Sequence, residues 1–221
     1  MEKQISKAFT FMFQDEDWKY KIILLVLLTF PSSYISYLNS SNQLKTAPIF
    51  LVIVSIITSL IISGYFAKCT QNIIFATPDD VNLLPKWEDN FLSFISIGFK
   101  KFLGSLLIGI VMLPASLLII PLLIFAYITI ALERVFCEEF KISSYFAWKR
   151  AFDLIAQDGG RYFKILLAFI PLALLLVVVM LLFIKLPIIL MIVIPAITAY
   201  YMLVSAYLIG AIGTEPVVIP D

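Results

Sequence analysis

The chain has no histidine and only two cysteines, Cys69 and Cys137, among its 221 residues. Without histidine there is no imidazole to ligate a metal, to act as a general base or to complete a Ser-His triad. The two cysteines are far apart and form no CxxC pair, which excludes a thiolate zinc site and a disulfide framework. We therefore predict no metal site, no cofactor, no catalytic residues and no enzymatic activity.

Charge is scarce as well. Charged residues make up 14% of the chain and hydrophobic residues 62%, whereas a soluble domain is usually about 25% charged and about 45–50% apolar. Sixteen Lys and Arg face fifteen Asp and Glu, so no basic surface points to nucleic acid as a partner. The apolar surplus predicts that the partner is the lipid bilayer and that residues 1–221 form a single membrane domain. The expected fold class is all-α, a polytopic transmembrane helix bundle.

The apolar runs give the membrane spans. A helix needs about 20 apolar residues to cross the ~30 Å hydrocarbon layer. A stretch at 97–132 is too long for one straight span and short for two, and Pro114 and Pro121 disfavour one unbroken helix there. Four other runs are clear: Ile22–Leu38, Ala47–Phe66, Phe163–Ile184 and Pro187–Ile209.

The distribution of lysine and arginine decides between these alternatives, because short loops rich in both stay in the cytoplasm. One span at 97–132 divides the basic residues nine to seven across the membrane, and a hairpin divides them fourteen to two. We therefore predict a multi-pass protein of the cell membrane with both termini in the cytoplasm. A re-entrant pair that dips in without crossing gives the same sidedness and remains an alternative. The six predicted spans are about 22–38, 47–66, 97–113, 116–132, 163–184 and 187–209.

Two amphipathic segments are predicted to be interfacial helices, at about 3–13 and 144–157. In the second, Ser143 or Ser144 can cap the helix, and the apolar face is formed by Tyr145, Trp148, Phe152 and Ile155. Aromatic rings are favoured at the headgroup level. The predicted interfacial anchors are Trp18, Trp87, Trp148 and Phe152.

Small residues form a stripe in the second span. Ser55, Ser59 and Ser63 recur every four residues, with Gly64 beside the last. Such a stripe lets two helix backbones approach closely and share hydrogen bonds. We interpret it as a helix-packing seam inside the bundle; the alternatives are a seam for self-association or a partner subunit, and a polar pathway.

Pro31, Ser32 and Ser33 interrupt the first span, and Ser36 extends the polar face. We expect a kink whose freed carbonyls are satisfied by neighbouring serines. The functional alternative is a discontinuous helix at a binding site.

Three segments resemble a known family. They are Phe13-Gln-Asp-Glu-Asp-Trp18-Lys19, Leu84-Pro85-Lys-Trp87-Glu-Asp89-Asn-Phe91 with Gly98 and Lys100, and Glu139-Phe140 with 145–155 and Tyr162. Their order and motifs resemble the prokaryotic membrane family catalogued as domain of unknown function 4013. The resemblance implies a multi-span bacterial or archaeal protein, and it brings no catalytic residues because that family has no established activity.

Function is constrained mainly by what the spans lack, since ionisable residues lie only at their ends. Proton relays and substrate counter-ions usually place such groups inside the bundle. We expect a non-catalytic subunit or scaffold of a membrane complex, bound to other membrane proteins or to copies of itself. The alternative is a transporter or channel for an uncharged or lipid-like solute.

Overall fold

The computed structural model describes residues 2–40, 48–77, 80, 82–88, 91–113, 119–183 and 187–212, and within these the only regular structure is helical. The prediction of an all-helical protein is therefore confirmed for this part of the chain. Its elements are α1 (Glu2–Thr10), η1 (Phe11–Gln14), α2 (Trp18–Ser40), α3 (Ile49–Ile74), α4 (Phe91–Met112), α5 (Ile119–Glu139), η4 (Ile142–Phe146), α6 (Trp148–Phe183) and α7 (Pro187–Gly210).

Four helices of the described part are long and apolar enough to cross a membrane. The span count of six stays a prediction, and Pro114, Ser116 and Lys185, at two of the predicted turns, lie outside the described residues. The four candidate spans are Trp18–Leu38, Ile49–Ile74, Phe91–Val111 and Val193–Gly210.

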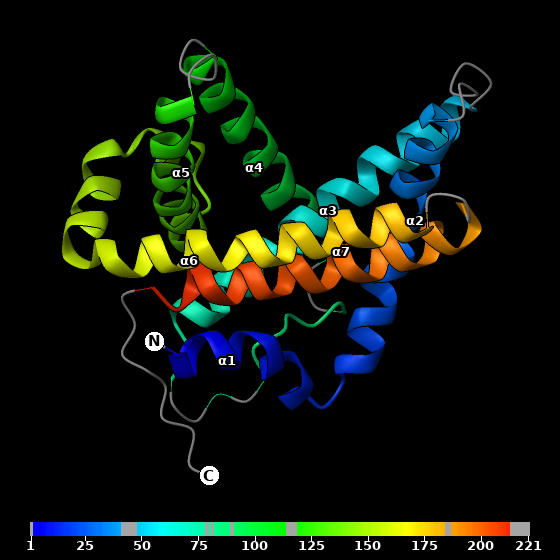
Figure 1. Ribbon diagram of the computed structural model, residues 1–221, viewed down its shortest axis with the longest axis horizontal. Coiled ribbons are helices and arrows are strands. Elements are labelled where there is room, and N and C mark those ends of the chain that lie inside the picture. The colour runs from blue at the N-terminus through cyan, green and yellow to red at the C-terminus, as the bar shows by residue number, and fades with distance from the viewer. Residues whose placement is uncertain are drawn as a thin grey trace.

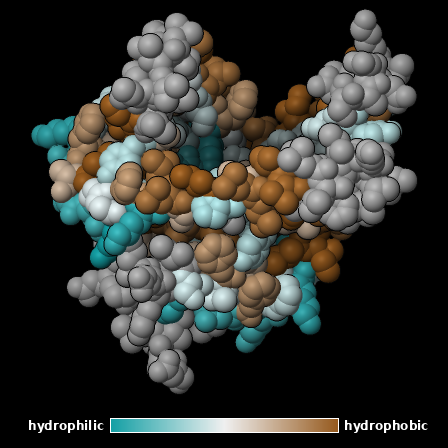
Figure 2. Space-filling view, in the orientation of Figure 1, coloured by the Kyte–Doolittle hydropathy of each residue, from teal (hydrophilic) through white to brown (hydrophobic). Residues whose placement is uncertain are grey.

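Large apolar side chains cover the outside of the bundle in stripes with helical spacing. On α2 the exposed stripe is Ile23, Leu27 and Phe30, and α3, α4 and α6 carry similar stripes. Exposed apolar area on this scale is typical of surfaces that contact a membrane or another protein. Figure 2 shows brown, hydrophobic surface over α6 and α7, with teal, hydrophilic residues at the left and lower edges near the start of α6 and α1.

The helices are not arranged as a parallel bundle. From their crossing point, α3 runs to the upper right of Figure 1 and α4 to the upper left, so the two hairpins diverge. Helix α7 packs against both α2 and α3. Helix α1 lies beneath α7 (Figure 1) and contacts it through Phe9, whose ring centroid is 6.3 Å from that of Tyr200.

Two stretches of the chain differ from the sequence prediction. Helix α3 continues beyond Phe66, where the predicted second span ends, as far as Ile74, because Ala67, Cys69 and Ile73 are buried in the core. The interfacial helix expected at 144–157 is instead the short η4 followed by the first turns of α6. Helix α6 then bends at Asp158, whose φ of −147° and ψ of 42° are not helical.

Candidate functional site

The part of the predicted seam nearer the start of α3, Ser55 and Ser59, contacts α2. The Ser32 hydroxyl lies 2.9 Å from that of Ser55 and 3.0 Å from that of Ser59, within hydrogen-bonding distance of both. Ser63, one turn further along α3, is half-buried. The serine hydroxyls therefore join two helices of the same chain.

The other end of the seam contacts a different helix. Gly64 and Gly98 mark the place where α3 crosses α4: a Cβ on Gly64 would collide with the Phe94 carbonyl, and one on Gly98 with the Leu60 carbonyl. Each glycine thus faces backbone of the partner helix, which is the close approach that small residues permit. The sequence analysis identified Gly64 but missed the role of Gly98; its signal was a small residue among large apolar ones at the start of α4.

The first span contains Pro31 without ending there, since α2 is helical from Trp18 to Ser40. Ser36 is exposed, and its hydroxyl donates to the Ser32 carbonyl at 3.0 Å. Ser33 is half-buried beside them. The carbonyl that Pro31 leaves free is that of Leu27, four residues before it, so this bond does not test the predicted kink, which stays a prediction.

A buried ion pair connects the start of α2 to the loop before α4. Asp15 and Lys21 have side chains only 2% and 5% exposed, and their charged atoms are 2.8 Å apart. The Lys21 ammonium also donates to the Leu84 carbonyl at 3.2 Å. Two of the segments that carry the family resemblance, around Asp15 and around Leu84, therefore meet in space.

Trp87 belongs to this cluster and is not an interfacial anchor in the structure. It is 7% exposed, and its ring stacks on Tyr65 of α3 with centroids 4.3 Å apart and planes 13° from parallel. The Trp87 Nε1 and Tyr65 hydroxyl have no hydrogen-bond partner among the described residues. A buried tryptophan of this kind contributes mainly apolar area.

The remaining predicted anchors are at the surface or close to it. Trp18 is half-buried at the start of α2, edge-on to Phe13 at 4.9 Å. Trp148 is half-buried, and Phe152 is 51% exposed. Tyr145 is buried, so the single apolar face predicted for 144–157 is divided between the core and the outside.

A second charged cluster lies between α4 and α5. Lys101 of α4 forms an ion pair with Glu133 of α5, and the Tyr145 hydroxyl donates to the same carboxylate at 2.9 Å. The segment η4 packs against both helices. A Cβ at Gly104 of α4 would collide with the Tyr145 ring, so this ring fills the space between the two helices.

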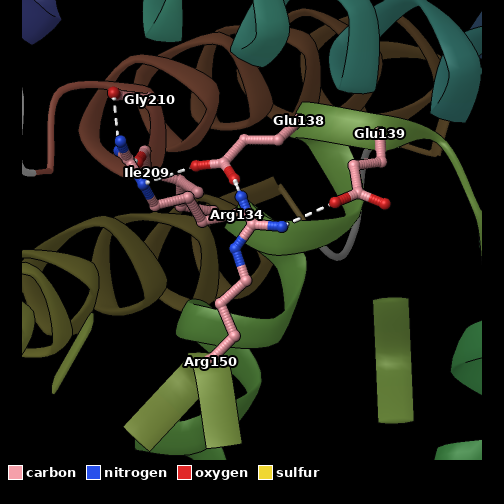
Figure 3. Close-up of polar contacts among 6 residues, drawn as sticks. All are labelled: Arg134, Glu138, Glu139, Arg150, Ile209 and Gly210. Carbon is pink, nitrogen blue, oxygen red and sulfur yellow. Dashed lines mark hydrogen bonds and ion pairs between the residues drawn. The ribbon is translucent and has the colours of Figure 1, made fainter. Parts of the chain in front are cut away.

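A third cluster holds α5, α6 and α7 together (Figure 3). Arg134 of α5 donates to the carbonyls of Ile209 and Gly210, at 3.2 and 2.9 Å. These are last-turn carbonyls of α7, which have no partner within the helix and favour a cation. Its Nε lies 3.4 Å from Glu138, close enough for an ion pair but without hydrogen-bond geometry.

Arg150, near the start of α6, completes this cluster from the outside. Its guanidinium bonds Glu138 at 2.5 Å and Glu139 at 2.6 Å, which ties the beginning of α6 back to the end of α5 (Figure 3). Arg150 is 48% exposed and Glu139 36%, so the cluster extends from the core to the surface. The sequence placed all four charged residues beyond the spans but gave no pairing.

The pKa values in these clusters follow from burial and from the paired charges. Burial, followed by the charge of Glu133, raises the pKa of Tyr145, so its hydroxyl stays protonated and able to donate. Hydrogen bonds from Arg150 and Lys141 lower the pKa of Glu139 below its ordinary value. Burial lowers the pKa of Arg134, which remains charged because arginine titrates far above neutral pH.

The clusters offer little for catalysis. Within the part of the chain that is described, no three Cys, Asp or Glu side chains are grouped so as to hold a metal ion. Cys69 and Cys137 are both free thiols buried in the core. Each charged cluster joins two or three elements of the chain, so its chemistry is that of holding helices together.

Comparison with models of protein families, with curated proteins and with solved structures finds no match to this chain.

Proposed function

We propose that the protein is a non-catalytic subunit or scaffold of a complex in the cell membrane. One observation carries the proposal: the charged side chains buried in the described part, Asp15, Lys21 and Arg134, all bond to other groups of the same chain. A transporter or intramembrane enzyme usually keeps such groups for a substrate or a proton. Here their bonds are used to connect helices.

The polar groups within the membrane support the same function. Ser32, Ser55 and Ser59 bond to one another across α2 and α3, which is what a packing seam requires. A solute path would need hydroxyls that face a passage. The serines therefore favour a scaffold over the alternative of a transporter for an uncharged or lipid-like solute.

The position of the Lys101–Glu133 pair bears on the span count. Glu133 directly precedes Arg134, which bonds the final carbonyls of α7, so the pair lies near the level at which α7 ends. From Lys101 to Leu113 there are twelve residues, which is about 18 Å of helix. That length is short of the ~30 Å needed to cross.

This geometry favours the re-entrant alternative for the α4–α5 hairpin over two full crossings. In the re-entrant arrangement α2, α3, α6 and α7 cross, and both termini remain in the cytoplasm because the number of crossings is even. The basic residues keep the same distribution across the membrane as in the six-span prediction. The prokaryotic origin implied by the resemblance fits a protein of the cytoplasmic membrane and is part of the proposal.

The proposal is tested by extracting the protein at its natural expression level, into nanodiscs or a gentle detergent, and identifying what co-purifies by mass spectrometry. A subunit should emerge with one or more proteins at a fixed ratio that is the same in both media. A lone protein or a homo-oligomer in both media would contradict the proposal.

Two controls sharpen this test. An unrelated multi-span protein with the same tag removes proteins that bind any exposed apolar helix. Liposomes containing the purified protein should show no more flux of neutral solutes than empty liposomes; flux that depends on Ser32 and Ser55 would favour the transporter instead.

A further inference from the structure

Lys100 and Lys101 lie halfway along α4, in the middle of a candidate span. The partner of Lys101, Glu133, is next to the cluster that ends α7 and extends to the exposed side chains of Arg150 and Glu139. The middle of α4 is therefore not at the middle of the bilayer. The two lysines lie near the level of the lipid headgroups.

The charges at this place do not cancel. Glu133 accepts from Lys101 through one carboxylate oxygen and from the Tyr145 hydroxyl through the other, so each oxygen already has a partner. Lys100 is half-buried and forms no ion pair with any residue that the structure describes. Two lysines and one glutamate leave a net charge of +1 that calls for an anion.

The site is also open. The side chains of Lys101 and Glu133 are 23% and 16% exposed. Figure 2 shows hydrophilic surface at the bottom of the hollow beside α4 and above α6. An outside group can therefore reach the spare donors of Lys101 without breaking its ion pair, since an ammonium has three donors.

The rim of the site is apolar. Leu103 and Leu107 follow Lys100 by three and seven residues and so share its face of α4; Leu103 is half-buried and Leu107 is 40% exposed. A single molecule that matches a cation beside such a surface has an anionic head and a hydrocarbon tail. Basic residues near the cytoplasmic leaflet attract anionic lipids in this manner, at about 1 kcal/mol for each lysine.

We propose that Lys100 and Lys101 bind the phosphate of an anionic phospholipid of the inner leaflet. The acyl chains of that lipid lie along Leu103 and Leu107. The site is independent of the subunit role, but it rests on the re-entrant arrangement proposed above, which places the two lysines at the headgroup level.

Native mass spectrometry of the protein with equal amounts of phosphatidylglycerol and phosphatidylcholine tests the site. The wild type should bind the anionic lipid first. Lys100→Met should reduce that preference about fivefold, which corresponds to about 1 kcal/mol. Lys100→Arg, which keeps the charge, should retain it. Lys101→Met is avoided because it would leave Glu133 without its cation.

Lys149→Met is the matched control, since Lys149 is an exposed lysine near the start of α6 and forms no ion pair with any described residue. It should leave the lipid preference unchanged. The proposal is overturned if Lys100→Met binds both lipids as the wild type does, or if both Met variants lose the preference equally. It is also overturned if millimolar inorganic phosphate displaces the lipid, because the phosphate alone would then be the ligand.

Discussion

The corner where α5, α6 and α7 meet and the outer parts of α3 and α4 show two opposite ways of stabilising a helix. At the corner, Arg134 is 6% exposed and bonds two helices, and three further charges surround it. In the outer parts, Ile53 and Ile56 of α3 and Ile110 of α4 are more than half exposed. The first region is held by specific pairs within the chain and the second by whatever apolar medium surrounds it.

This difference shows which region is the rigid part of the molecule. Buried charges leave few alternative arrangements, because any shift strands a charge without its partner. Apolar helix faces in lipid have no such restriction, since lipid chains solvate them equally in many positions. We therefore expect substitutions at the corner to destabilise strongly, and substitutions on the outer faces of α3 and α4 to do little.

The largest effect is expected for Arg134→Met. The substitution removes the donors for the α7 carbonyls and one of the two cations beside Glu138. It should lower the free energy of unfolding by about 3–5 kcal/mol. Thermal unfolding in detergent measures the change. Arg161→Met is the control: Arg161 pairs with Asp158 at a half-exposed site and should contribute less than about 1 kcal/mol. Equal effects from both variants would remove the distinction between the two regions.

The second effect concerns the crossing of α3 and α4. Gly98→Ala places a methyl group against the Leu60 carbonyl, and the helices must separate at a cost of about 1–3 kcal/mol. Gly109→Ala, further along the same helix, adds a methyl group where nothing lies within 4 Å. Fluorescence-detected gel filtration after heating should show a loss of folded protein for the first variant alone. If Gly109→Ala proves as harmful, helix α4 is packed along its whole length and the contrast fails.

A smaller effect is expected for Tyr145→Phe. The variant keeps the ring between α4 and α5 and removes the hydroxyl, whose hydrogen bond to Glu133 is worth about 1.5 kcal/mol because the acceptor is charged. Tyr20→Phe, at a side chain 55% exposed, serves as the comparison and should change the unfolding temperature little. An unchanged unfolding temperature for Tyr145→Phe would show that the ring alone carries the contact.

The smallest effect is that of pH on Glu139. Its bonds to Arg150 and Lys141 lower its pKa in the folded protein below the ordinary value of 4.5. The stabilisation is therefore complete above the unfolded pKa and is lost as the pH falls through the lower folded pKa. Unfolding temperatures from pH 6 to pH 3 should fall less for Glu139→Gln than for the wild type, and high salt should reduce that difference. A steeper fall for the variant would contradict the pairing.

The apolar runs were enough to predict the helices, because length and hydropathy are local properties of the chain. The small residues at a spacing of four indicated the seam, since residues at that spacing lie on one helix face. They could not assign partners: Ser55 and Ser59 contact Ser32 of α2, whereas Gly64 contacts Phe94 of α4. Which helix faces which stripe depends on the crossing geometry of the whole bundle.

The aromatic residues show most clearly what the local sequence cannot predict. Trp87 and Tyr145 lie in polar segments, which is typical of interfacial anchors, yet both are buried. Trp87 stacks on Tyr65, and Tyr145 fits over Gly104. An aromatic ring among charges has the same local pattern in either role, so only its tertiary neighbours distinguish them.

The claim that the Lys101–Glu133 pair lies at the headgroup level is tested most directly by labelling single cysteines with a membrane-impermeant maleimide. The native Cys69 and Cys137 are buried and can stay in place. Ile49→Cys, at the outer end of α3 and 80% exposed, should react in intact cells, and Ser143→Cys, at an exposed position of η4, should react only after the cells are opened. Leu113→Cys, at the far end of α4, should react under neither condition, because a re-entrant hairpin leaves it in the hydrocarbon layer. Labelling of Leu113→Cys in intact cells as fast as Ile49→Cys would contradict the account and establish two full crossings.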